Sequence, residues 1–227
     1  MLMKKLLSTL VVAFSCYITF GQDNSLFTEF DNIVGINNTK LSYGVIYKEK
    51  YRKKFRDNHN FYIDDTFKTG SVFYRNQEFK NIELKYELVD DFIVVKINNQ
   101  EQQISIVPEK TLVKRFSIEN TSFIYSDSYG FLEELLVKEQ FSVLKKHQKT
   151  AKENRDADYR YHTFRKKENN VLLFKDSFYP IDSKRDFYKI FPAQKKQIAA
   201  FYKSNTFLLK NDYKTFVAKL ITSLSQE

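Results

Sequence analysis

Two pairs of adjacent carboxylates are the residues of this chain best suited to acid, base or metal chemistry. Asp64 and Asp65 stand in YIDDTF, and Asp90 and Asp91 stand in LVDDFIVVKI. Glycosidase-type catalysis needs two carboxylates facing one bond about 5–10 Å apart. Neighbouring residues of an extended strand point to opposite faces, so neither pair meets this requirement alone. Calcium could gather carboxylates from both pairs, but the D-x-D-x-D-G spacing of calcium loops is missing.

Aspartate is also common in turns, because its side chain can accept hydrogen bonds from nearby backbone N–H groups. We therefore expect Asp90 and Asp91 to form an exposed corner between two strands. Both carboxylates buried around one ion or one cleft would contradict this interpretation.

Other catalytic and metal-binding patterns are missing from the sequence. The three histidines lack the HExxH spacing and a close partner, which disfavours a zinc site; they are His59, His147 and His162. No P-loop, GxSxG or GxGxxG motif occurs. Ser142 and Lys145 form an SxxK and residues 68–70 spell KTG, but penicillin-binding enzymes carry these motifs in the opposite order and place SxxK on a helix. We assign no catalytic, cofactor-binding or metal-binding residue, and we expect a protein that is not an enzyme.

The first 21 residues have the layout of a secretory signal peptide. A basic head, Met1–Lys5, precedes an apolar stretch, Leu6–Phe20, that is too short and too interrupted for a transmembrane helix. We expect residues 1–21 to be removed and the mature protein to be exported without spanning a membrane. An alternative is a lipoprotein anchored at Cys16. Because Cys16 is the chain's single cysteine, we expect no disulfide and a fold that relies on its hydrophobic core.

Composition and charge narrow the possible partners. The chain is 42% hydrophobic and 16% aromatic, which excludes a disordered protein. Residues 132–227 hold 20 Lys and Arg against 12 Asp and Glu, whereas the first 131 residues are nearly balanced. This basic half predicts either a solvated face or attraction to an envelope protein or an anionic envelope component. Nucleic acid is not an expected partner, because no binding motif accompanies the charge.

Alternating apolar and polar residues predict an antiparallel sheet in the middle of the chain. In NIELKYEL every second residue is apolar, as in a strand with one buried face. Further strands are expected over SVFYRN, FIVVKI, QQISIV, LVKRFSI and TSFIYSD, with turns at 98–100 and 128–130. A hairpin is expected over 131–150, followed by two shorter strands over DYRYHTFR and VLLFKDSFYPI.

Helical periodicity appears at the end of the chain. Apolar residues recur at helical spacing over 213–224, behind Asn211 or Asp212 as the N-cap. Shorter helices are expected before Pro192 and over AQKKQIAAFYKSN. We therefore predict an α+β fold, an antiparallel meander or half-barrel-like sheet followed by C-terminal helices. The expected division is an irregular segment over 22–70 and a single β-rich domain over 71–227, with its helices over 183–225.

Several segments together resemble exported proteins of the Bacteroidetes group for which no activity is established. The segments are FKTGSVFY (67–74), FKNIELKYELVDD (79–91), YGFLEELL (129–136), VLKKHQKT (143–150) and FYKIFPAQKKQIAAFYKSN (187–205). The resemblance implies export and a sheet followed by helices, and it transfers no catalytic residue. It also implies retention in the periplasm or at the outer-membrane periphery, since the predicted helix over 211–225 replaces the β-sandwich sorting domain of many proteins secreted by this group.

Three classes of function are compatible with these patterns. The first is a non-catalytic periplasmic or envelope-associated binding module. The second is a carrier of an apolar or lipid ligand, which requires a large dry pocket on a curved sheet. The third is a carboxylate-dependent hydrolase, which requires the aspartates of the two pairs to converge in a cleft.

Overall fold

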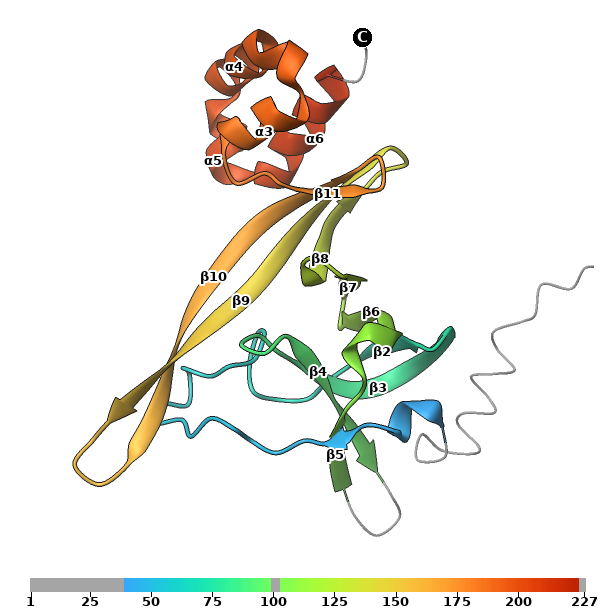
Figure 1. Cartoon of the computed structure of the whole chain (residues 1–227), viewed down its shortest axis with the longest axis vertical. Helices are drawn as coiled ribbons and strands as arrows, with labels where there is room; N and C mark the ends of the chain where they lie inside the picture. The colour runs from blue at the N-terminus through green and yellow to red at the C-terminus, as the bar shows by residue number, and fades with distance from the viewer. Residues whose placement is uncertain (1–38, 99–102, 225–227) are drawn as a thin grey trace, which may run out of the picture.

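The computed structural model describes residues 39–98 and 103–224, and these form one open antiparallel sheet followed by helices (Figure 1). The expected signal peptide, Cys16 and most of the predicted turn at 98–100 lie outside the described residues. The strands are β1 (Val45–Ile46), β2 (Lys68–Tyr74), β3 (Gln77–Glu87), β4 (Phe92–Asn98), β5 (Gln103–Val107), β6 (Val113–Ile118), β7 (Thr121–Ser126), β8 (Gly130–Val137), β9 (Phe141–Arg155), β10 (Arg160–Phe174) and β11 (Ser177–Pro180).

The order of the strands departs from a simple meander at one point. The sheet runs β1-β5-β4-β3-β2-β6-β7-β8-β9-β10-β11, so the chain returns after β5 to place β6 beside β2. A short 3-10 helix, Lys110–Leu112, lies on this return. The remaining strands pair with their sequence neighbours, and two-residue turns such as Arg75–Asn76 adopt the positive φ angles that suit tight hairpins. The expectation of an antiparallel sheet followed by helices is confirmed.

The hairpin of β9 and β10 is longer than the sequence suggested. The two strands pair over 15 consecutive positions without a register shift, from Phe141 opposite Phe174 to Arg155 opposite Arg160. The expectation of two shorter strands over 158–165 and 171–181 is therefore wrong, because β10 continues through the polar stretch KKENN. Backbone pairing with β9 holds this stretch in the sheet although its side chains are not apolar.

Helices cover one end of this hairpin, while its other end projects away from them (Figure 1). They are α3 (Lys184–Ile190), α4 (Lys195–Ser204), α5 (Thr206–Asn211) and α6 (Tyr213–Leu224). The predicted stripe of α6 is buried, and Phe216 and Leu220 belong to the same apolar core as Phe141 and Val143 of β9. Asp212 caps α6, since its carboxylate accepts the N–H of Thr215 at 3.2 Å. Every helix of the described residues is too short or too polar to cross a bilayer.

A second core lies within the sheet and consists largely of aromatic rings. Phe116 stacks on Phe123 with ring centroids 4.6 Å apart, and Phe131 packs edge-on against Phe116 at 5.0 Å. Tyr86 contacts all three rings. These side chains are almost fully buried and pack in the edge-to-face and offset geometries that aromatic pairs favour.

The segment between β1 and β2 is irregular, as expected, but it docks on the sheet. The N–H of His162 in β10 donates to the carbonyl of Arg52 at 2.7 Å, so the backbone around Lys53 pairs with the edge of β10. The Asn58 side chain bonds both the N–H and the carbonyl of Phe164. This segment therefore covers the β10 edge where β11 has ended.

Candidate binding surface

Asp90 and Asp91 lie in the turn that joins β3 to β4, as the sequence predicted. The buried carboxylate of Glu87 holds this turn from inside, accepting the N–H groups of Val89 at 3.0 Å and Asp90 at 2.6 Å. Burial raises the pKa of Glu87 despite these two hydrogen bonds. Asp90 is exposed and binds Lys50 at 2.9 Å, so it behaves as the corner residue that was expected.

Asp91, in contrast, points inward and accepts three hydrogen bonds. Its donors are the hydroxyl of Tyr86 and the ammonium groups of Lys110 and Lys146, the last at 2.6 Å. The side chain of Asp91 is 17% exposed and that of Lys146 only 6%. Burial opposes ionisation of Asp91, but the charge of Lys146 and the hydrogen bonds outweigh it and hold the pKa below its ordinary value. The expectation that both carboxylates would be exposed is therefore wrong for Asp91.

Gly130 is the residue that leaves room for this ion pair. It has a φ of +71°, and a Cβ atom at this position would lie 1.9 Å from a carboxylate oxygen of Asp91 and 3.1 Å from Lys146 Nζ. The pair thus joins the β3–β4 turn to the start of β8 and to β9.

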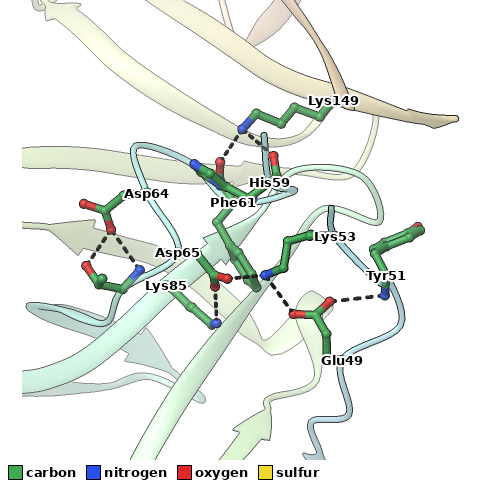
Figure 2. A network of polar contacts seen from close by, with 10 residues as sticks. Glu49, Tyr51, Lys53, His59, Phe61, Asp64, Asp65, Lys85 and Lys149 are labelled. Atoms are coloured by element: carbon green, nitrogen blue, oxygen red, sulfur yellow. Dashed lines mark hydrogen bonds and ion pairs between the residues drawn. The ribbon is translucent and has the colours of Figure 1, made fainter. Parts of the chain in front are cut away.

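Asp64 and Asp65 also bind separate partners (Figure 2). Asp64 caps its own turn, accepting the N–H of Thr66 at 2.9 Å. The hydrogen bonds of Thr66 and Lys68 lower the pKa of Asp64 to about 2. Asp65 lies between Lys53 and Lys85, and the ammonium of Lys85 is 2.7 Å away.

Each of the four aspartates is bound to one or two lysines, and among the described residues none of these lysines is shared between two of the aspartates. Hydrolysis of a glycosidic bond requires two carboxylates that face one bond, and no contact among the described residues brings two of these aspartates to a common partner.

His147 has carboxylate partners that sequence reasoning missed. Its Nε2 contacts Glu133 of β8, and its Nδ1 lies 3.0 Å from an oxygen of Glu168 in β10 without hydrogen-bond geometry. Burial opposes ionisation of Glu168, but the hydrogen bond from Lys166 and nearby positive charges lower its pKa. The pairing register of the strands brings these three residues together, and it places Glu168 directly opposite His147. The described residues contain no cluster of His, Cys, Asp or Glu suited to a metal ion.

Lys149 fastens the irregular segment to the inner side of β9 (Figure 2). Its ammonium donates to the carbonyls of His59 at 2.7 Å and Phe61 at 2.8 Å. Burial, together with the charge of Lys166, lowers the pKa of Lys149 to about 8. One face of the β9–β10 hairpin is therefore occupied by the segment over 47–67.

The opposite face of the hairpin is basic over 148–152 and 163–167, where neither strand contributes an acidic side chain to it. Because β9 and β10 pair without a shift, alternate residues of both strands share this face. Lys152 lies opposite Thr163, Thr150 opposite Arg165, and Gln148 opposite Lys167. We call these six residues the basic face. Its three cations are exposed, and within the described part of the chain none of them forms an ion pair.

A pocket of about 880 Å³ opens within the segment over 53–66. Its lining includes exposed Phe55 and Ile63, but also Lys54, Arg56 and Asp57. Such a mixed and open lining does not provide the dry apolar cavity that an apolar ligand needs.

No protein-family model matches the chain, and no curated protein or solved structure shows significant similarity to it. The resemblance to exported proteins of the Bacteroidetes group therefore stays a prediction. Any assignment of function depends on the chain's own geometry, in which the basic face gathers three exposed cations that form no ion pair with the described residues.

Proposed function

We propose that the mature chain is an exported, non-catalytic binding module that contacts an anionic component of the cell envelope through the basic face. The observation that carries this proposal is the acid-free arrangement of Lys152, Arg165 and Lys167 on one exposed side of a regular hairpin. The signal-peptide pattern and the Bacteroidetes resemblance support export to the periplasm or the outer-membrane periphery.

The electrostatic reason lies in the contrast between the two faces of the hairpin. On the covered face, Lys145 and Lys166 lie near Glu168, which partly neutralises them. On the basic face, Lys152 and Arg165 have only neutral side chains opposite them. Like charges gathered without counterions create a positive potential that attracts and orients an anionic partner. Because these cations are exposed to water and form no ion pair, no internal ion pair has to be broken before they bind an anionic partner.

The experiment is a comparison of two triple charge reversals in full-length, exported protein. The first variant carries Lys152→Glu, Arg165→Glu and Lys167→Glu. The control carries the same change at three exposed lysines of α4, Lys195→Glu, Lys196→Glu and Lys203→Glu, so that both lose equal net charge. After crosslinking in intact cells and fractionation, the first variant should lose its envelope partner and the control should keep it. Equal recovery of the partner with both variants would contradict the proposal.

A carrier of an apolar ligand is the second candidate, but the packing of the sheet weighs against it. A half-barrel carrier would keep space inside its curved sheet, whereas Phe116, Phe123 and Phe131 fill the interior with mutual ring contacts. The pocket over 53–66 is lined by charged as well as apolar side chains. Native mass spectrometry of the purified chain would support the carrier if it detected a retained lipid. The separated aspartates leave the hydrolase without a supporting observation.

A further inference from the structure

The basic face continues into a group of aromatic and basic side chains at the projecting end of the hairpin. Tyr159 and Tyr161 lie on the same side of β10 and its turn as Arg165, and their ring centroids are 6.0 Å apart. The docked segment adds Arg52 and Lys54, which run beside β10 at this point. The basic face is therefore bordered by rings as well as by cations.

The two tyrosine rings are already occupied by cations from the docked segment. The guanidinium of Arg52 lies 4.3 Å from the ring centroid of Tyr159, and Lys54 Nζ lies 5.0 Å from that of Tyr161. A sugar or a nucleic-acid base binds aromatic residues by stacking on a ring face. Since cations cover a face of both rings, this pair is poorly suited to stacking on a saccharide or a base.

Phe55 supplies an exposed apolar group at the same place. It packs edge-on against Tyr161, with ring centroids 6.4 Å apart, and is 53% exposed. Exposed Ile63 lines the same open pocket. An exposed phenylalanine beside tyrosines and basic residues is the arrangement by which proteins enter the interface of a bilayer, where rings and aliphatic stems lie below the headgroups and cations remain among them.

Acidic residues near this end do not cancel its charge. Asp156 binds Lys54 at 2.5 Å, and Glu153 binds Arg160 at 3.2 Å. Asp64 and Asp65, which line the same pocket as Phe55, are likewise bound to lysines. Asp57 and Asp158 form no ion pair among the described residues, and these two are fewer than the unpaired cations of the basic face together with Arg56 and Arg155.

We propose that the anionic component bound by this chain is a phospholipid bilayer, which Phe55 enters while Lys152, Arg165 and Lys167 contact anionic headgroups. This inference rests on the proposed function and names its partner. The hairpin end would lie in the interface as a peripheral anchor, with the helices held away from the membrane at the other end of the sheet (Figure 1).

The chain contains no tryptophan, so a single introduced tryptophan reports on its own position. Phe55→Trp is the test variant, and Phe207→Trp is the control, since Phe207 is 76% exposed on α5. With phosphatidylcholine vesicles containing phosphatidylglycerol, emission of the Phe55→Trp protein should shift to shorter wavelength, and that of Phe207→Trp should not. Vesicles of phosphatidylcholine alone should give neither shift.

Binding measurements then separate this inference from the proposed function. Affinity for the anionic vesicles should fall by at least about a hundredfold in the Lys152, Arg165 and Lys167 triple reversal, since each basic residue near an anionic surface contributes about a fivefold factor and each introduced glutamate adds repulsion. Phe55→Ser should reduce it by about tenfold, through lost burial of apolar area. The α4 triple reversal and Phe207→Ser should leave it unchanged.

A soluble polyanion, inorganic polyphosphate, is the comparison ligand. If polyphosphate binding depends on the basic face while vesicles of either composition are not bound, the bilayer inference is wrong and the proposed function remains. If neither ligand is bound, both are wrong. Equal blue shifts for tryptophan at 55 and at 207 would also overturn the inference, because they would place the whole surface at the membrane.

Discussion

Replacing Asp91 by asparagine should destabilise the fold far more than the same change at its neighbour Asp90. In Asp91→Asn the ammonium of Lys146, 6% exposed, loses the charged group that it contacts at 2.6 Å. Removing one partner of a buried ion pair typically costs about 3–5 kcal/mol. Asp90 is 40% exposed and its partner Lys50 is 65% exposed, so Asp90→Asn should cost at most about 1 kcal/mol. The expected difference in the free energy of unfolding is at least about 2 kcal/mol.

Urea unfolding followed by circular dichroism measures this difference at neutral pH. A domain of this kind loses about 1–3 kcal/mol of stability per molar urea, so the midpoint of Asp91→Asn should fall by on the order of 1 M or more below that of Asp90→Asn. Adding Lys146→Met to Asp91→Asn should recover part of the loss, because it removes the uncompensated charge. Equal midpoints for the two single variants would refute the view that Asp91 forms a buried structural pair.

The same pair predicts a dependence on acid. The pKa of Asp91 is lower in the folded protein than its ordinary value, so the unfolded chain binds more protons in this range. Its stabilising contribution is present above the ordinary pKa and is lost as the pH falls through the folded value. The stability difference between the natural chain and Asp91→Asn should therefore shrink in acid, whereas a constant difference down to the acid transition would contradict this assignment.

Three further substitutions test other contacts. Gly130→Ala should cost at least about 2 kcal/mol in urea unfolding, from a strained positive φ and a clash with Asp91, and an unchanged midpoint would exclude this crowding. Lys149→Gln should remove a rise in stability between pH 8 and about 10.5, since the folded pKa of Lys149 is about 8 and the unfolded chain holds its proton to higher pH. Stability curves of the natural chain and of Lys149→Gln that stay parallel over this range would exclude a lowered pKa of Lys149. Leu220→Ala should lower the free energy of unfolding by about 2–5 kcal/mol, because Leu220 is fully buried on the inner side of α6. Thr222→Ala, on the exposed side of α6, should change it little.

Much of the secondary structure was predictable because it follows from local periodicity. The alternation in NIELKYEL matches β3, and the stripe over 213–224 matches α6 with Asp212 as its cap. The length of β10 was not predictable, because KKENN carries no apolar signal and is held in the sheet by pairing with β9. The return of β6 to the side of β2 was missed for a related reason, since strand order depends on contacts between distant segments.

The candidate site was likewise only partly predictable from the sequence. Sequence reasoning placed Asp90 and Asp91 in a turn and located the excess of positive charge in the C-terminal half. It could not tell that one aspartate would face the solvent and the other Lys146, which lies 55 residues further along the chain.

By itself, the sequence determined the class of the fold, the turn between β3 and β4, and the sign of the charge, because composition and short-range periodicity govern these properties. The tertiary structure alone decided which charges are neutralised. Register across the long hairpin brings His147 beside Glu168 on one face and places neutral residues opposite Lys152, Arg165 and Lys167 on the other. A pairing shift by one residue would turn the side chains of one strand to the other face, and Lys152 would no longer share a face with Arg165 and Lys167.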